Sequence, residues 1–253
     1  MPNIVALTNG SPHSWIILNA LAERFGSFKV LIEDKESRRV LLRRRMKRQG
    51  FLKVAGQVGF TLLQVVVGRL SRPRIRRIIQ EFALNPHPAP GCEVIRIGSV
   101  NAPACRDALA AARPDVVVVF GTRMIRAETL SVIQVPILNL HSGITPKYRG
   151  QAGGYWALAS GDPEHAGVTV HLLDAGVDTG AVLRQAPFSA GAGDTFPTYF
   201  YLQAAALREP TVQAVEDVLA GTHRPYRPEL PSRQHYHPTL WGYLYRGIRR
   251  GVW

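Results

Sequence analysis

Short apolar runs alternate with amphipathic segments over the first half of the chain, a pattern typical of α/β proteins. Strands are predicted at 3–8, 28–33, 93–97 and 114–120, and helices at 14–25 and 103–112. The run 115–120 is apolar without alternation, as expected for a strand that is covered on both faces. The pattern therefore predicts a doubly wound, mostly parallel sheet with its site at the carboxyl ends of the strands.

The second half continues with predicted strands at 136–140, 168–173 and 181–189. A helix starts at 153, and a helical region from 195 to 220 is expected to break near Pro210, because proline cannot donate a helical hydrogen bond. We predict a catalytic domain over 1–190 with a basic helical insert at about 35–90. A C-terminal extension, helical and then aromatic and basic, is expected over 191–253.

Polar side chains follow the ends of two of these strands. Asn139 and His141 are two residues apart and should point to the same side where the run at 136–140 ends. The run at 168–173 leads into a glycine-rich loop that carries Asp174 and Asp178. An amide, an imidazole and a carboxylate delivered by neighbouring strand ends could form an acyl-transfer site.

The order of motifs in this part of the chain resembles the 10-formyltetrahydrofolate-dependent formyltransferases. The motifs are Asn139-Leu-His141, Pro146-Lys-Tyr148-Arg149-Gly150, Gly167-Val-Thr169-Val-His171 and Asp178-Thr-Gly180. The resemblance implies the Rossmann-like formyltransferase fold, with 10-formyltetrahydrofolate as the formyl-donating cosubstrate and no metal. It also implies that Asn139 polarises the formyl carbonyl, that His141 assists the oxyanion and the proton transfer, and that Asp178 orients the imidazole.

The same resemblance implies a cofactor pocket and a substrate site. The cofactor pocket would be lined by Gly121, Thr122, Arg123, Met124, Ile125, Asp174 and Gly176. The substrate candidates are Gly10 and Ser11, in the turn after the first strand, and Lys147, Tyr148 and Arg149. An ordinary strand-to-helix turn and a solvated charged loop are the simpler interpretations of these two groups. For His171 we favour a packing role on the strand.

The net charge of +13 is concentrated in the insert. Residues 35–80 contain 14 of the 31 Lys and Arg residues but only one of the 18 acids, Glu36. The apolar stretch at 51–70 is near the lower length limit for a membrane span and carries Lys53 and two glutamines, so a span is disfavoured. The first interpretation is a helical insert packed on the body, and the second is contact with a membrane or a lipid-linked substrate. Nucleic-acid binding comes last, because few aromatics lie among the arginines.

The remaining features set broader limits. Cys92 and Cys105 are too few for a disulfide framework and lack metal-ligand spacing. The chain opens on a predicted strand with no basic leader, so we expect a cytoplasmic protein, or one peripheral at the inner membrane surface. The tail at 224–253 combines aromatics with arginines, which favours an interface with lipid or with a second copy in a homodimer, or a brace on the domain.

For function, we expect transfer of a formyl group to a small-molecule primary amine. Methionyl-tRNA enzymes of the family carry a C-terminal barrel for which there is no room after Ala190, and the purine enzymes lack a basic insert. An amino sugar, free, nucleotide-linked or lipid-linked, therefore fits best. The alternatives are a formyltetrahydrofolate hydrolase and a catalytically idle relative that binds anionic surfaces.

Overall fold

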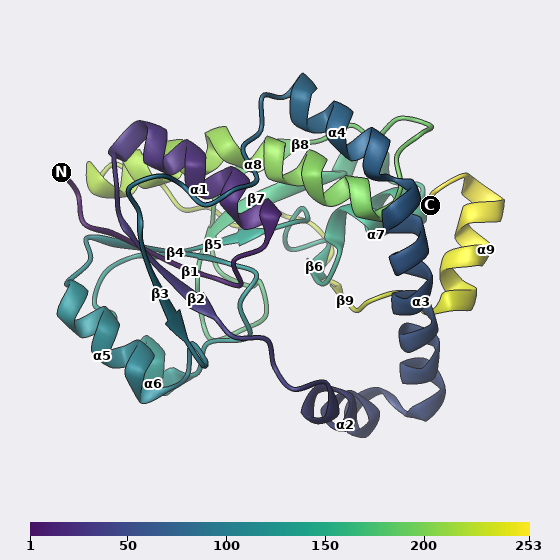
Figure 1. Ribbon diagram of the computed structural model, residues 1–253, viewed down its shortest axis with the longest axis horizontal. Coiled ribbons are helices and arrows are strands. Elements are labelled where there is room, and N and C mark those ends of the chain that lie inside the picture. The colour runs from purple at the N-terminus through teal and green to yellow at the C-terminus, as the bar shows by residue number, and fades with distance from the viewer.

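The computed structural model describes residues 1–253 and contains one large sheet and one small sheet (Figure 1). The strands are β1 (Ile4–Thr8), β2 (Lys29–Glu33), β3 (Glu93–Ile97), β4 (Val116–Phe120), β5 (Ile137–His141), β6 (Arg149–Gly150), β7 (Gly167–Leu172), β8 (Val182–Pro187) and β9 (Gln234–His235). The helices are α1 (Pro12–Phe25), α2 (Arg38–Gln49), α3 (Phe51–Leu70), α4 (Arg72–Glu81), α5 (Pro103–Ala112), α6 (Ala127–Leu130), α7 (Gly153–Ser160), α8 (Phe196–Leu219) and α9 (Leu240–Arg250). One 3-10 turn covers Pro163–His165.

The large sheet has the strand order β3-β2-β1-β4-β5-β7-β8. The five strands from β3 to β5 are parallel, whereas β7 and β8 are antiparallel to their neighbours. The predicted doubly wound, mostly parallel sheet is confirmed. The chain reverses its direction of winding between β1 and β4, which is where open sheets of this kind place their ligand sites.

Helices cover both faces of the sheet, and the strand residues divide between two cores accordingly. Val116 and Val118 of β4 belong to the core that contains α1 and α8, whereas Val117 and Val119 belong to the core under α5. Figure 1 shows α1 and α8 above the sheet and α5 with α6 below it. This two-sided burial explains the uninterrupted apolar run of β4.

The expected break at Pro210 is wrong, because α8 runs without interruption from Phe196 to Leu219. Pro210 is buried within the helix, and the next residue, Thr211, donates its hydroxyl to the carbonyl of Leu207 at 2.6 Å. The proline removes one hydrogen bond, but α8 lies on α1 and on the sheet, and this packing outweighs the lost bond. Because α8 shares its core with residues before 190, packing continues across the expected boundary at 190.

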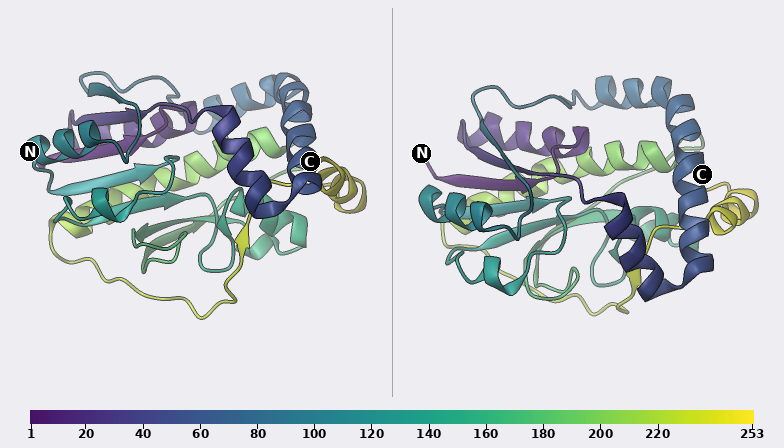
Figure 2. Two further views of the ribbon diagram at one scale, coloured as in Figure 1. Left: turned by 90° about the horizontal axis from the view of Figure 1, so that it is seen from below. Right: turned by 60° about the horizontal axis from the view of Figure 1, so that its bottom comes forward.

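The insert between β2 and β3 forms three consecutive helices, α2, α3 and α4. Helix α4 is attached to the body by an ion pair between Arg74 and Asp194 at 2.8 Å. Helix α3 packs against α9, the helix of the C-terminal tail, while α2 has no buried residue. Figure 2 shows α3 standing across the end of the sheet, with α9 on its outer side. The tail is thus a brace on the insert, and its helix is an element that the sequence pattern did not predict.

Candidate active site

Asn139 and His171 lie side by side, because β5 and β7 are antiparallel neighbours whose register pairs these two residues. The amide nitrogen of Asn139 is 3.0 Å from Nε2 of His171. The pairing of β7 with β8 shifts register between Val170 and His171, and such irregularities often redirect side chains beside active sites. The position of His171 is therefore set by the sheet itself.

Asp178 reaches these residues from the loop after β7. Its backbone is left-handed, with φ of 51°, and its Oδ2 accepts a 2.8 Å hydrogen bond from the backbone N–H of Gly150. The loop then turns at Gly180, where an added Cβ would lie 1.6 Å from the carbonyl oxygen of Leu172. Only glycine can therefore take this close approach, which brings the carboxylate back to Asn139 of β5 and His171 of β7.

The carboxylate of Asp178 bridges the amide and two imidazoles. Its Oδ1 accepts from Nδ2 of Asn139 at 3.1 Å, and the same oxygen lies 3.7 Å from Nε2 of His171. Its Oδ2 is 3.5 Å from Nδ1 of His141. The structure thus brings Asn139, His141 and Asp178 together as expected, and it adds His171, for which a packing role was favoured from the sequence.

The two histidines differ in where their polar atoms point. In His171, Nδ1 lies 2.8 Å from the carbonyl oxygen of Leu172, so this nitrogen carries the proton and Nε2 has a lone pair toward Asn139. In the buried His141, Nε2 lies 2.7 Å from the carbonyl oxygen of Tyr148. Both imidazoles are buried, and of the two only His171 lines the cleft described below.

Electrostatics keep Asp178 ionised. Burial alone would raise the pKa of its carboxyl, but His141 and the Gly150 N–H oppose this, and the pKa is held well below its ordinary value of 3.8. Asp178 is therefore a permanent anion near neutral pH. It can accept a proton only transiently, or pass one between its imidazole neighbours.

A cleft of about 700 Å³ opens in front of this cluster, a size typical of small-molecule sites. Asn139, His171 and Asp178 line it. All seven expected cofactor-pocket residues line it too: Gly121, Thr122, Arg123, Met124, Ile125, Asp174 and Gly176. The side chain of Arg123, however, is paired with Glu33 at 2.7 Å, and the Arg123 N–H donates to the same carboxylate at 2.9 Å. Arg123 therefore anchors the 121–125 loop to β2.

The basic insert contributes a wall of this cleft, which the sequence pattern did not indicate. Arg44, Arg45 and Arg48 of α2 line it. Arg44 makes two hydrogen bonds to Glu36, at 3.0 and 2.9 Å, whereas Arg45 and Arg48 have no carboxylate partner. Burial, and then the neighbouring Arg44, lower the pKa of Arg45 from its ordinary value. Two unpaired guanidinium groups thus face the space in front of the cluster, and the local charge excess was the only signal in the sequence.

The residues expected to bind substrate outside the cluster do not line the cleft. Ser11 caps α1 by accepting from the Ser14 N–H at 3.3 Å, and Gly10 precedes it in the same turn. Lys147 and Tyr148 both contact the carboxylate of Asp162, at 2.7 and 2.6 Å.

The segment from Tyr148 to Gly150 instead supports the cluster from behind. The carbonyl of Tyr148 contacts His141, Arg149 donates to the carbonyl of Val177 at 2.6 Å, and Gly150 donates to Asp178. These contacts position the acid and one imidazole. Arg149 therefore acts on the protein's own backbone.

Asp162, Glu164 and His165 are close enough together to hold a metal ion. The ammonium group of Lys147 lies 2.7 Å from Asp162 and 3.2 Å from Nδ1 of His165. A cation is thus already supplied by the protein. The group lies outside the cleft.

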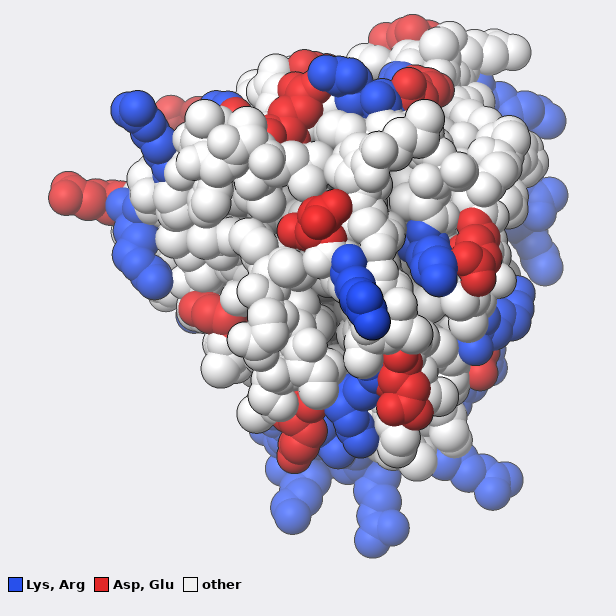
Figure 3. Space-filling view, turned by 90° about the vertical axis from the view of Figure 1, so that its left-hand side faces the viewer, with Lys and Arg blue, Asp and Glu red and all other residues white.

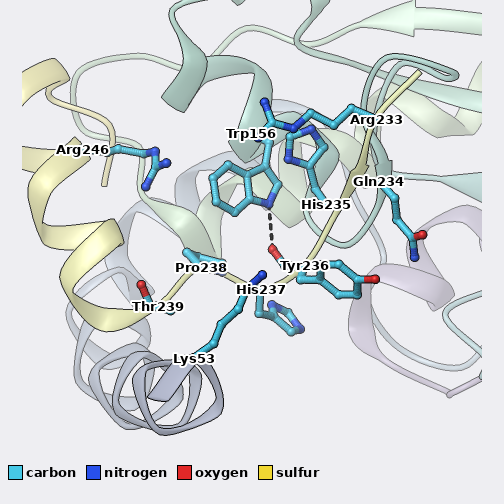
Figure 4. A pocket seen from close by; sticks show the side chains of 10 residues that line it. All are labelled: Lys53, Trp156, Arg233, Gln234, His235, Tyr236, His237, Pro238, Thr239 and Arg246. Atoms are coloured by element: carbon cyan, nitrogen blue, oxygen red, sulfur yellow. Dashed lines mark hydrogen bonds between the residues drawn. The ribbon is translucent and has the colours of Figure 1, made fainter. Parts of the chain in front are cut away.

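A second, smaller pocket of about 220 Å³ shares the lining residues 234–236, which include β9, with the cleft, and Figure 4 shows its side chains. Lys53, Arg233 and Arg246 line it together with the aromatic side chains of Trp156 and Tyr236. The guanidinium of Arg246 is 4.9 Å from the ring centre of Trp156, and Nζ of Lys53 is 5.2 Å from that of Tyr236. None of the three cations pairs with a carboxylate.

Comparison with known proteins agrees with this geometry. Residues 76–211 match the model of the formyl transferase family. A methionyl-tRNA formyltransferase from Synechocystis sp. is 35% identical over 125 residues, which cover 49% of this chain and 37% of that protein. The chain thus spans less than half the length of the curated relatives it matches.

Solved structures share the fold at low identity. A sugar N-formyltransferase from Shewanella sp. has a TM-score of 0.58 at 14% identity, covering 93% of this chain and 76% of that one. Glycinamide ribonucleotide transformylase 1 from Symbiobacterium toebii has a TM-score of 0.54 at 21% identity, covering 92% of each chain. HypX from Aquifex aeolicus, in complex with tetrahydrofolic acid, has a TM-score of 0.53 at 16% identity, covering 93% of this chain and 29% of that one. Because the family model matches more than half of the chain, the protein belongs to the formyl transferase family.

Proposed function

We propose that this protein transfers a formyl group from 10-formyltetrahydrofolate to a primary amine. The observation that carries the proposal is the convergence of Asn139, His171 and Asp178 on one cleft, with His141 behind them. An amide donor, an imidazole lone pair and an ionised carboxylate are the groups that acyl transfer to an amine requires. Membership of the formyl transferase family supports the identity of the transferred group.

In the proposed reaction, the amine forms a bond to the formyl carbon and the bond from that carbon to the folate nitrogen breaks. The N–H of Asn139 would donate to the formyl oxygen, where negative charge develops. His171, whose Nε2 carries a lone pair, and Asp178 would take the proton from the attacking amine and return it to the folate nitrogen. His141, when protonated, would donate from Nδ1 toward Asp178 and stabilise its charge from the buried side.

The residues present fit a folate. The cleft of about 700 Å³ is wide enough for a pterin ring and its side chain, and the 121–125 loop forms part of its wall. The acidic tail of a folate would find the guanidinium of Arg126, which also lines the cleft. The structural neighbour HypX, whose structure contains tetrahydrofolic acid, supports this choice of cosubstrate.

For the acceptor we propose an amino sugar linked to phosphate, as a nucleotide or a lipid conjugate. Arg45 and Arg48 supply positive charge beside the cluster, and guanidinium groups suit phosphate oxygens. A structural neighbour that is a sugar N-formyltransferase supports this class. The methionyl-tRNA formyltransferases among the relatives make aminoacyl-tRNA the main competing acceptor.

The test is a panel of amines incubated with the protein and 10-formyltetrahydrofolate, read by mass spectrometry for the gain of one formyl group. The panel contains amino-sugar nucleotides, lipid-linked amino sugars, glycinamide ribonucleotide and methionyl-tRNA. Formylation of a sugar conjugate, at a kcat/KM at least tenfold above that for methionyl-tRNA, is the expected result. Formylation of methionyl-tRNA alone would contradict the acceptor class but not the reaction.

A hydrolase is the rival within the same chemistry, because water could take the place of the amine at the same cluster. Release of formate from 10-formyltetrahydrofolate in the absence of any amine measures this reaction directly. We expect formate release to be slow and to be suppressed when the amine is added. Formate release at full rate without an acceptor would replace the transferase proposal by a deformylase.

A further inference from the structure

Helix α3 presents an apolar face to the outside. It contains 20 residues and is long and apolar enough to cross a membrane by length and composition alone, yet only 22% of its most apolar window is buried. Its outward residues include Phe51, Leu62 and Leu70, which are 76%, 66% and 75% exposed. Val58, Val65 and Val66 are exposed at helical spacing between them.

Helix α3 lacks the polar outer side expected for a helix at a water surface. Its inward side includes Gln57, which is buried and donates to Gln49 and to the carbonyl of His237 at 3.0 and 3.1 Å. Its outward side is apolar over almost its whole length. Soluble proteins rarely expose a contiguous apolar surface of this kind without a partner.

Helix α9 extends this surface. Trp241, Leu244, Tyr245 and Ile248 are exposed and recur at helical spacing, so they share one side of α9, and Ile248 is 77% exposed. Trp241 lies across α3 at Gly56, where an added Cβ would be 2.4 Å from the indole ring. Helix α9 therefore packs on α3 at this glycine, and we call the exposed apolar residues of the two helices together the α3–α9 face.

Positive charge surrounds this face. Seven of the 12 residues of α2 are Arg or Lys, and none of them is buried. Arg249 and Arg250 end α9, and no Asp or Glu occurs between residues 37 and 80 or after residue 230. Figure 3 shows blue and red side chains mixed on another side of the molecule, whereas only blue side chains project at its bottom edge, where Figure 1 places α2. The apolar face thus lies within a basic border.

A lipid bilayer with anionic headgroups matches both properties, because it offers apolar chains and negative charge within a few ångströms of each other. A second copy of the chain fits less well, since a symmetric contact through this face would bring the same arginines together. Nucleic acid would match the arginines but not the leucines and valines. The pocket at Lys53 and Arg246 offers a further place for a headgroup phosphate, since these residues belong to α3 and α9 (Figure 4).

We propose that the α3–α9 face binds the surface of an anionic phospholipid bilayer, with α3 and α9 lying in the headgroup region. The helix lies on the membrane and does not span it, because Phe60 and Gln57 hold its inner side to the body and to the tail. Helix α2 is part of this basic border and also lines the cleft. The cleft would therefore open close to the bilayer. The inference rests on the fold and its surface, not on the proposed reaction.

The experiment is flotation of the full chain with vesicles of phosphatidylcholine alone, and of phosphatidylcholine with 30% phosphatidylglycerol. We expect binding to the anionic vesicles at least tenfold tighter than to the neutral ones, and weaker binding at high salt. Leu62→Glu and Ile248→Glu should each weaken binding by about tenfold or more, because each places a charge where an apolar side chain enters the bilayer. Val132→Glu, at an exposed apolar position outside the face, is the matched control and should bind like the wild type.

A second pair of variants separates charge from apolar contact. Arg43→Gln and Lys47→Gln remove charges of α2 that do not line the cleft, and they should weaken binding to the anionic vesicles only. Failure to bind anionic vesicles, or equal binding by Leu62→Glu and Val132→Glu, would overturn the proposal. A dimer in solution that Leu62→Glu dissociates would also overturn it. So would binding to RNA that is tighter than binding to vesicles and that Leu62→Glu weakens to the same extent. Formyl transfer to a soluble acceptor should be unchanged in Leu62→Glu, so this test fails or succeeds separately from the proposed function.

Discussion

The amide nitrogen of Asn139 donates a 3.1 Å hydrogen bond to Oδ1 of Asp178, across 39 residues of sequence. The same nitrogen is 3.0 Å from His171, so both of its hydrogens are directed at partners within the protein. A substrate oxygen that accepts from this amide must therefore replace one of the two. Asp178 orients the amide of Asn139 so that its nitrogen, rather than its oxygen, faces the cleft. The carboxylate therefore determines that the substrate meets a hydrogen-bond donor at this position.

Asp178→Asn tests this relationship. The variant keeps the shape of the side chain but removes the charge that orients Asn139 and the two imidazoles. We expect formyl transfer to fall by about 10²–10³-fold while the circular dichroism spectrum is retained. Asp107→Asn, at an exposed position of α5, is the control and should keep full activity. Near-normal turnover by Asp178→Asn would remove the basis of the proposed site.

Gly180→Ala tests whether the return of the 174–180 loop is needed. The added methyl group would lie 1.6 Å from the Leu172 carbonyl, so the loop must move and carry Asp178 with it. We expect a loss of roughly 1–3 kcal/mol in the free energy of unfolding, measured by urea titration, together with loss of activity. Gly193→Ala, where nothing lies within 4 Å of the new methyl group, should leave both unchanged. Equal behaviour of the two variants would contradict the prediction.

Arg45 and Arg48 test the contribution of the insert to substrate binding. Arg45→Gln and Arg48→Gln remove unpaired cations that line the cleft but do not touch the cluster. We expect KM for the phosphate-linked amine acceptor to rise about tenfold or more, because the variants lose charge-assisted hydrogen bonds to the bound acceptor. We expect kcat to be nearly unchanged. Arg39→Gln, on α2 but outside the cleft, is the control. A fall in kcat at constant KM would point to a different role.

Stability should decrease at mildly acidic pH. Burial lowers the pKa of His13, His235 and His237 to about 4 from an ordinary value of 6.5, with nearby arginines adding to the effect for His235 and His237. The unfolded chain therefore binds more protons than the folded one between these pH values. Stability is fully present above pH 6.5 and is lost as the pH falls toward 4.

Thermal unfolding measured from pH 7.5 to pH 4.5 checks this prediction. His13→Phe should reduce the pH dependence of Tm, because a phenyl ring can keep the contacts with Phe200 and Tyr201 and has no proton to bind. His87→Phe, in the loop before β3, changes a histidine outside this group and should leave the pH dependence of Tm as it is in the wild type. A Tm that is constant over this range would contradict the prediction.

Local patterns in the sequence were sufficient for the strands of the large sheet and for the helices α1 and α5. The apolar run of β4 predicted burial on both faces, and the order Asn139, His141, Asp178 identified the polar cluster. These features depend on neighbouring residues and on strand ends, so they can be predicted from the order of residues in the chain. The continuity of α8 through Pro210 does not, because it depends on packing against α1 and the sheet.

The sequence by itself determined the fold class, the amide, imidazole and carboxylate of the site, and the concentration of charge in the insert. Only the tertiary structure decided that His171 joins the cluster, that Arg45 and Arg48 line the cleft, and that α9 covers one side of α3. Each of these outcomes depends on a contact between segments far apart in the chain. Such contacts are selected by the register of the sheet and by the burial of complementary surfaces, which no local pattern specifies.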